Sequence, residues 1–94
     1  MAVSPPPALD ILGVPKLTLY GKPGCHLCGD AREVVEHVRK QLDFELEEVD
    51  VSSDPRLYRE YGERIPVLAV DDEELFELFV DPDELRRRLD RVAP

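Results

Sequence analysis

Short runs of apolar residues follow two different periods along this chain, and each change of period marks an expected element. Residues 16–20 predict a short strand, which glycines and a proline at residues 21–24 interrupt. The next apolar residues recur at helical spacing and form one stripe: Ala31, Val34, Val35, Val38 and Leu42. This stripe predicts a helix that begins near Cys25 and ends near Leu42.

Residues 44–51 predict a second strand with an irregular pattern. Its apolar positions change parity between Leu46 and Val49, which leaves two alternatives, a bulge or a strand buried on both faces. Residues 52–55 then place a capping side chain before a proline, which is typical of a helix start. Gly62 ends this short helix.

The C-terminal third predicts two further strands and a last helix. Residues 65–70 form a third strand that opens with a proline, and an acidic turn joins it to a fourth at residues 75–79 as an antiparallel hairpin. The last helix begins at residues 81–84 with a capping aspartate, a proline and acidic residues. The order is β-α-β-α-β-β-α. Because a strand–helix–strand start requires a right-handed parallel crossover, we expect an α/β fold with a mixed four-stranded sheet flanked by helices.

The length of 94 residues corresponds to one domain. Residues 1–15 are rich in proline and lack a sustained period, so we expect a mobile N-terminal extension followed by a folded domain at residues 16–94. The N-terminus has no basic region followed by a long apolar one, and no apolar run approaches the length of a membrane span. We therefore expect a cytoplasmic protein.

The chain is strongly acidic, with 12 basic and 21 acidic residues and a net charge of −9. Such a surface repels phosphate backbones and anionic lipid, so we expect neither nucleic acid nor membrane as a partner. Two interpretations of the charge remain: it maintains solubility, or it steers a basic partner protein toward the molecule.

The two cysteines, Cys25 and Cys28, stand where the first strand gives way to the first helix. In a reducing compartment, two lone cysteines are more often redox-active or metal-binding than structural. Backbone N–H groups and the helix dipole stabilise a thiolate at Cys25, and Lys22 adds a nearby cation. Cys28, one turn further on, lies within reach of a disulfide with Cys25.

Taken together, the element order, the C-x-x-C at the first strand–helix junction and the proline that opens the third strand resemble the glutaredoxins, within the thioredoxin fold. The segments PGCHLC at residues 23–28 and YGERIPVL at residues 61–68 are similar to small bacterial glutaredoxin-like proteins. The resemblance covers roughly residues 16–92. It implies a thiol–disulfide oxidoreductase in which Cys25 is the nucleophile and Cys28 the resolving thiol.

The resemblance also implies a substrate-binding role for Lys22, Ile65 and Pro66. Glutaredoxins commonly carry a lysine three residues before the first cysteine. Proteins of the thioredoxin fold place a cis proline at the position of Pro66, facing the dithiol, although only about 5–6% of X–Pro bonds are cis in general. The backbone of Ile65 is then left to pair with an extended substrate as a short added strand.

The chain also departs from the glutaredoxin pattern. Glutaredoxins usually carry two glycines just before the acidic pair that opens the last helix, and these residues help to hold glutathione. Here the acidic pair is Asp83-Glu84, while Val80 and Asp81 stand where the glycines would be. The tyrosine of the usual C-P-Y-C is absent as well. Glutathione binding is therefore left open, whereas the redox dithiol is retained.

The sequence thus predicts a monomeric oxidoreductase that reduces protein or glutathione disulfides, with no bound cofactor, no metal, and glutathione as a candidate reductant. One alternative is an iron–sulfur or metal-binding protein acting as a bridged dimer, because two cysteines supply half of a four-thiolate site. A proline packed over Cys25 would crowd such a metal. A second alternative is a non-catalytic adaptor that binds partners through its acidic face.

Overall fold

The computed structural model of this protein describes residues 14–92. Within them, the chain forms four strands, three α-helices and one 3-10 turn: β1 (Lys16–Gly21), α2 (His26–Arg39), β2 (Glu45–Asp50), η1 (Val51–Ser53), α3 (Pro55–Tyr61), β3 (Val67–Val70), β4 (Glu73–Glu77) and α4 (Pro82–Val92). The order β-α-β-α-β-β-α predicted from the sequence is confirmed.

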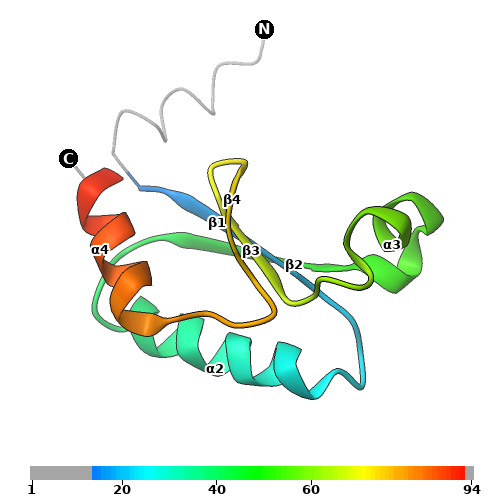
Figure 1. Ribbon diagram of the computed structural model, residues 1–94. Coiled ribbons are helices and arrows are strands. Elements are labelled where there is room, and N and C mark those ends of the chain that lie inside the picture. The colour runs from blue at the N-terminus through cyan, green and yellow to red at the C-terminus, as the bar shows by residue number, and fades with distance from the viewer. Residues whose placement is uncertain (1–13, 93–94) are drawn as a thin grey trace, which may run out of the picture.

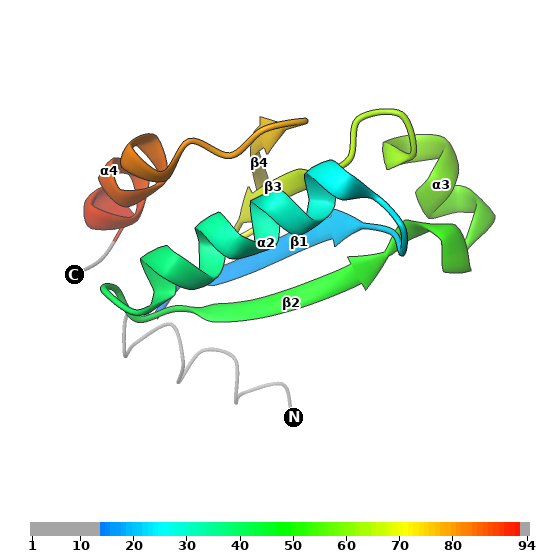
Figure 2. The same ribbon diagram turned by 90° about the horizontal axis from the view of Figure 1, so that it is seen from below.

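The four strands form one mixed sheet in the order β2-β1-β3-β4. Strand β1 pairs in parallel with β2 and antiparallel with β3, and β3 pairs antiparallel with β4. Figures 1 and 2 show α3 beyond the end of the sheet at which β1 and β2 finish, apart from α2 and α4. The parallel crossover places the start of α2 at that same end.

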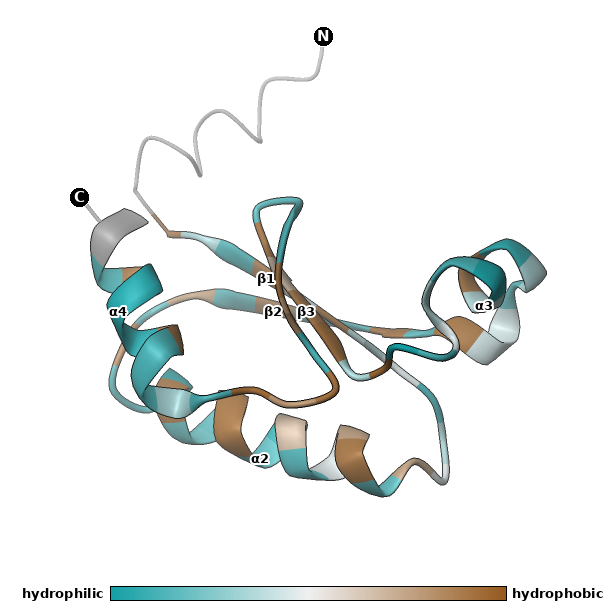
Figure 3. Cartoon of the chain, in the orientation of Figure 1, coloured by the Kyte–Doolittle hydropathy of each residue, from teal (hydrophilic) through white to brown (hydrophobic). Residues whose placement is uncertain are grey.

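The core lies between one face of the sheet and the helices α2 and α4. Its buried residues come from β1 and β3, from the predicted stripe of α2, and from the region of α4: Leu17, Leu19, Ala31, Val35, Val38, Leu68, Val70, Val80, Leu85 and Leu89, together with Phe44. Hydrophobic and hydrophilic residues are interspersed along the turns of α2 in Figure 3, as expected for a helix that covers a sheet with one face. The core therefore fixes α2, and with it the cysteines.

The irregular pattern of the second strand has a simple explanation. The pairing of β1 with β2 is continuous from Lys16 opposite Glu45 to Gly21 opposite Asp50, so β2 contains no bulge. Leu46 and Val49 are each half-buried, and their positions in a regular strand put them on opposite faces. The other four residues of this edge strand are exposed, so neither alternative, the bulge or the strand buried on both faces, is observed.

Three predicted boundaries are corrected. Helix α2 ends at Arg39 rather than near Leu42, because the chain tightens there and the Lys40 N–H donates to the His37 carbonyl. Strand β3 begins at Val67 rather than at residue 65. Strand β4 spans Glu73–Glu77 rather than residues 75–79, because Asp71 and Asp72 both adopt positive φ angles, of 48° and 75°, in a two-residue turn.

The start of β1 is fastened to its neighbours. Pro15 is buried, and its carbonyl accepts a hydrogen bond of 2.9 Å from the Glu45 N–H. The Lys16 N–H donates to a carboxylate oxygen of Asp71 at 3.0 Å, and the Lys16 carbonyl accepts from the Asp71 N–H at 2.9 Å. The predicted mobile extension at residues 1–15 falls mostly outside the described residues.

Among the helices of residues 14–92, none combines the length and the apolar character needed to cross a membrane.

Candidate dithiol site

Cys25 is the N-cap of α2. Its backbone is extended, with φ −92° and ψ 114°, and its Sγ accepts a hydrogen bond of 3.1 Å from the Cys28 N–H. Its carbonyl accepts the Gly29 N–H at 3.2 Å, which is the first bond of the helix. The sulfur therefore lies among the free N–H groups of a helix start, where partial positive charge stabilises a thiolate.

A disulfide joins Cys25 to Cys28, whose Cα atoms are 5.2 Å apart. The two sulfurs differ in their access to solvent. Cys25 is half-buried, whereas only 3% of Cys28 is exposed. A molecule that approaches from solvent therefore meets Cys25, and Cys28 lies behind it.

A glycine at the end of β1 makes room for the buried sulfur. A Cβ atom built on Gly21 would lie 3.1 Å from the Sγ of Cys28 and 3.2 Å from its Cβ, which is tighter than ordinary contact. Gly21 therefore allows the end of β1 to approach Cys28 closely. The sequence pattern indicated this residue only as a strand breaker, although a glycine at the end of the predicted strand, four residues before Cys25, was a visible signal.

A second hydrophobic cluster surrounds the cysteines, apart from the main core. Its buried members are Cys28, Val51 and Ile65, and Tyr20, Cys25, Leu57 and Tyr61 pack against it. The structure thus brings Ile65, a predicted substrate-binding residue, into the same cluster as the dithiol. The Ile65–Pro66 peptide bond is cis, as expected, and Pro66 is fully buried.

Lys22 is exposed, and its ammonium group lies over the ring of Tyr58 in α3, 5.5 Å from the ring centroid. This is the geometry of a cation–π contact. The contact ties the loop before Cys25 to α3, a partner that the sequence analysis did not foresee. The predicted effect of Lys22 on the thiolate stays a prediction.

Two tyrosines from distant parts of the chain stack beside the cluster. The rings of Tyr20 and Tyr61 have their centroids 4.1 Å apart and their planes 13° from parallel. Hydrogen bonding with Tyr20, together with burial, raises the pKa of Tyr61 to about 12. Tyr61 therefore stays neutral at physiological pH.

Arg64, directly before Ile65, connects α3 to β4. Its guanidinium lies 5.3 Å from the Tyr61 ring centroid and forms ion pairs with Glu60, Glu74 and Glu77 at 3.5, 2.9 and 3.1 Å. Hydrogen bonds with the Glu74 and Glu77 carboxylates raise the pKa of Arg64 above its usual value. The sequence analysis did not single out this residue.

The backbone of the same segment holds the residue after β4. The Leu78 N–H is shared between the carbonyl of Pro66, at 2.7 Å, and the carbonyl of Arg64, at 3.2 Å. Leu78 has a positive φ of 70°, an uncommon conformation for leucine, and this is where β4 ends. Arg64 and Leu78 thus enclose the Ile65–Pro66 segment.

Within residues 14–92, no three histidine, cysteine, aspartate or glutamate side chains come together as a set that would hold a metal ion. The two cysteines of the motif pair with one another.

Comparison with known proteins places these features in a family. A sequence model of the family described as "Glutaredoxin-like domain (DUF836)" matches residues 16–90. Among the curated proteins, uncharacterised proteins of Mycobacterium bovis and Mycobacterium tuberculosis are 29% identical over 82 residues, which cover 82% of this chain and 84% of theirs.

Solved structures agree with this match. A Nitrosomonas europaea protein solved by NMR is 35% identical, with a TM-score of 0.70, and the match covers 80% of this chain and 91% of that one. A protein of X. campestris solved by X-ray crystallography is 38% identical, with a TM-score of 0.68 and coverage of 83% and 99%. A mutant thioredoxin of Halobacterium salinarum is 26% identical, with a TM-score of 0.64 and coverage of 92% and 83%.

Proposed function

This chain belongs to the glutaredoxin-like domain family, and on that premise we propose that it is a thiol–disulfide oxidoreductase that reduces disulfides through Cys25 and Cys28. One observation carries the proposal: Cys25, which is partly exposed, lies at the N-terminus of α2 and forms a disulfide with Cys28, of which only 3% is exposed. An accessible, electrostatically stabilised thiolate with a shielded partner is what disulfide exchange requires.

In the first step, the Cys25 thiolate attacks one sulfur of a substrate disulfide. A bond forms between Cys25 and that sulfur, the substrate S–S bond breaks, and the other substrate sulfur leaves as a thiolate that takes up a proton. The Cys28 N–H, which lies 3.1 Å from the Cys25 sulfur, stabilises the attacking anion.

In the second step, Cys28 loses its proton and attacks the Cys25 sulfur. The Cys25–Cys28 disulfide forms, and the remaining substrate sulfur leaves as a thiolate and is protonated. Two electrons pass from the dithiol to the substrate, and each broken S–S bond is replaced by a new one. A cellular reductant, for which glutathione and a thioredoxin reductase are the candidates, returns the disulfide to the dithiol.

We further propose that Ile65, Pro66 and Lys22 dock the substrate, which is a disulfide-containing protein or glutathione. The packing of Ile65 in the cysteine cluster supports this role for its backbone, and Pro66 has no N–H to compete for a partner strand. We place this cycle in the cytoplasm, with the protein as a monomer and with neither nucleic acid nor membrane as a partner.

The proposal is tested with reduced protein and hydroxyethyl disulfide, coupled in parallel to glutathione with glutathione reductase and to thioredoxin reductase. Consumption of NADPH in either arm is expected for the wild type, and the arm that responds identifies the reductant. Cys25→Ser is expected to abolish turnover. Cys28→Ser is expected to retain the first step and to accumulate a mixed disulfide at Cys25, detectable by mass spectrometry.

No turnover of any disulfide by the wild type would reject this function. Bound iron in freshly purified protein would then favour the bridged dimer. An intact but inactive dithiol would favour the adaptor.

A further inference from the structure

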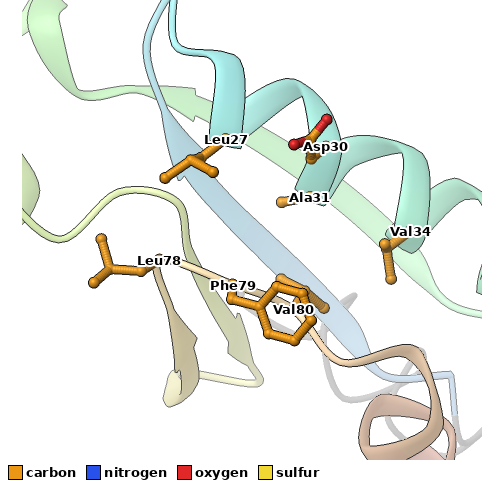
Figure 4. Close-up of a pocket in the computed structure, with 7 residues that line it drawn as sticks. All are labelled: Leu27, Asp30, Ala31, Val34, Leu78, Phe79 and Val80. Atoms are coloured by element: carbon orange, nitrogen blue, oxygen red, sulfur yellow. The ribbon is translucent and has the colours of Figure 1, made fainter.

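A shallow, open hollow lies between α2 and the segment that joins β4 to α4 (Figure 4). Leu27 of α2 lies on one side, and Leu78 and Phe79 of the joining segment lie on the other. The remaining lining residues are apolar except for Asp30, whose carboxylate lies at the rim of the hollow and points away from Leu78 and Phe79 in Figure 4. We call this hollow the Leu27–Phe79 groove.

The groove gathers most of the large hydrophobic side chains that are exposed among the described residues. Four large hydrophobic side chains are exposed within the part of the chain whose side chains the structure describes, and three of them line the groove: Leu27 at 48%, Leu78 at 47% and Phe79 at 68%. Apolar surface concentrated in one place marks an interaction site more often than scattered residues do.

Two links connect the groove to the cysteines: one through the covalent chain and one through a hydrogen bond. Leu27 stands between the two cysteines in the motif. Leu78 is held by the carbonyl of Pro66 at 2.7 Å, and Ile65, the residue before Pro66, packs in the cysteine cluster. A substrate whose disulfide reaches Cys25 therefore has its neighbouring residues within reach of this groove.

The charges around the groove favour an occupant with positive charge. Asp30 is the one charged residue of the lining. The exposed His26 lies 3.6 Å from its carboxylate and is a cation only when protonated. Glu77 and Asp81 flank the joining segment. Arg64, the nearby cation, is already bound by three carboxylates. An anionic occupant meets repulsion here, and a cationic one is attracted.

We propose, on the basis of the function proposed above, that the Leu27–Phe79 groove binds a segment of a protein disulfide substrate in which a large apolar residue stands beside a lysine or arginine. The apolar side chain lies between Leu27 and Phe79, and the basic side chain pairs with Asp30. Glutathione disulfide, which carries four carboxylates and two ammonium groups, lacks both features and is the poorer substrate.

Two synthetic peptide disulfides of equal length test this inference, one with Leu-Lys beside the cysteine and the other with Ser-Glu. Glutathione disulfide and the small, neutral hydroxyethyl disulfide complete the set of probes. The second-order rate constant for oxidation of the pre-reduced protein by each disulfide, which corresponds to kcat/KM for that disulfide, is measured without a coupling reductase and compared across all four. The wild type is expected to prefer the Leu-Lys peptide over the Ser-Glu peptide and over glutathione disulfide.

Variants of the groove assign the preference. Phe79→Ser is expected to lower kcat/KM for the Leu-Lys peptide by about tenfold, because most of one apolar contact is lost. Asp30→Asn is expected to lower it by about two- to fivefold and to weaken its dependence on salt. Asp90→Asn, an equal change of charge on an exposed residue of α4, serves as the matched control and is expected to leave the rate unchanged.

The hydroxyethyl disulfide separates the two proposals. If it is reduced by every variant at the wild-type rate while the peptide preference falls, the groove is the binding site. Equal wild-type rates for both peptides would overturn the groove proposal but not the proposed oxidoreductase activity. The same holds if Phe79→Ser loses activity equally toward hydroxyethyl disulfide and toward the Leu-Lys peptide. Absence of reaction with every probe would reject the oxidoreductase and the groove proposal with it. A wild-type dimer that Phe79→Ser converts to a monomer in sedimentation, with unchanged peptide rates, would assign the groove to a second copy instead.

Discussion

The asymmetry of the two cysteines is set by single residues around them. Cys25 caps the helix and is half exposed, and Cys28 is packed against Gly21 at the end of β1. In the reduced protein we expect the first sulfur to carry a stabilised negative charge with access to solvent, and the second to have neither. The chemistry expected of each thiol follows from these surroundings rather than from the motif alone.

Alkylation rates of the reduced protein are expected to reflect this asymmetry. Iodoacetamide should modify Cys25 faster than Cys28 near neutral pH, with an apparent pKa for Cys25 below the free value of about 8.5. Peptide mapping by mass spectrometry as a function of pH measures both rates. Equal rates, or a faster Cys28, would contradict the role given to the helix N-terminus.

Substitution of Gly21 is expected to cost stability because of the close sulfur. In Gly21→Ala, the new Cβ would crowd the Sγ of Cys28, and overpacking of this kind costs about 1–3 kcal/mol of unfolding free energy. Gly29→Ala is the matched control. Its Cβ meets no atom within 4 Å, and alanine is favoured over glycine in a helix by up to about 1 kcal/mol. Urea denaturation of the oxidised proteins should move the two midpoints in opposite directions, and a stabilised Gly21→Ala would show that the sulfur has room to shift.

Ionisation of Tyr61 links the stacked tyrosines to stability at high pH. Its pKa is raised to about 12 from the ordinary value of 10, so folding favours the neutral phenol. The resulting stability is fully present below pH 10 and is lost as the pH rises toward 12. The urea midpoint of the wild type should fall between pH 9 and pH 12, and the midpoint of Tyr61→Phe should fall less steeply over the same range. Identical slopes would exclude Tyr61 as the cause.

At the scale of elements, Arg64 links α3, β4 and the segment between them. It joins α3 to β4 through carboxylates, and the backbone between them carries Ile65 and Pro66. The Leu78 N–H closes the arrangement by donating to two carbonyls of that backbone. Arg64 is therefore a positioning residue in the proposed mechanism, since no hydrogen bond or ion pair joins it to either cysteine.

Replacement of this arginine is expected to affect binding more than chemistry. Arg64→Met should raise KM for a protein disulfide while leaving kcat for hydroxyethyl disulfide close to the wild-type value, because the dithiol itself is untouched. Arg64→Lys should recover part of the loss. Arg87→Met, which removes an exposed pair with Glu84 on α4, is the control. If Arg64→Met lowers kcat for hydroxyethyl disulfide as much as it lowers kcat for the protein disulfide, Arg64 acts on the dithiol and not on docking.

The sequence predicts elements well where the signal is local. The stripe of α2 and the caps of α3 and α4 are each formed by residues close together in the chain, and all three helices are present, although α2 ends at Arg39 rather than near Leu42. The fourth strand was shifted by two residues because an Asp-Asp pair is a weak signal for a tight turn with two positive φ angles. Leu78 and Phe79 then looked like strand residues, and the groove that they line was missed.

The candidate site was predictable only in part for a related reason. The motif itself and the proline after Ile65 are visible in the sequence. The stacking of Tyr20 on Tyr61, the position of Lys22 over Tyr58 and the carboxylates around Arg64 join residues far apart in the chain, so no periodicity indicates them. Such contacts depend on the packed sheet and helices.

At the scale of the whole molecule, the main core and the cysteine cluster are two separate groups of packed side chains, and the cysteines belong to the smaller one. The main core joins α2 and α4 to β1 and β3, whereas the smaller cluster at the other end of β1 contains the cysteines. Because α2 belongs to both, the packing of its stripe fixes the orientation of the helix start. A packed scaffold with Cys25 at its edge suits the proposed reaction with protein disulfides.

The hydrogen bonds of Lys16 fix the start of β1 at the end of the sheet remote from the cysteines, and α4 finishes near the same end (Figure 1). A linker, an affinity tag or a solid support joined through either of these ends would therefore leave the reactive edge pointing outward. The fold is thus suited to immobilisation: beads carrying Cys28→Ser protein could capture oxidised client proteins as covalent adducts and release them with a small thiol.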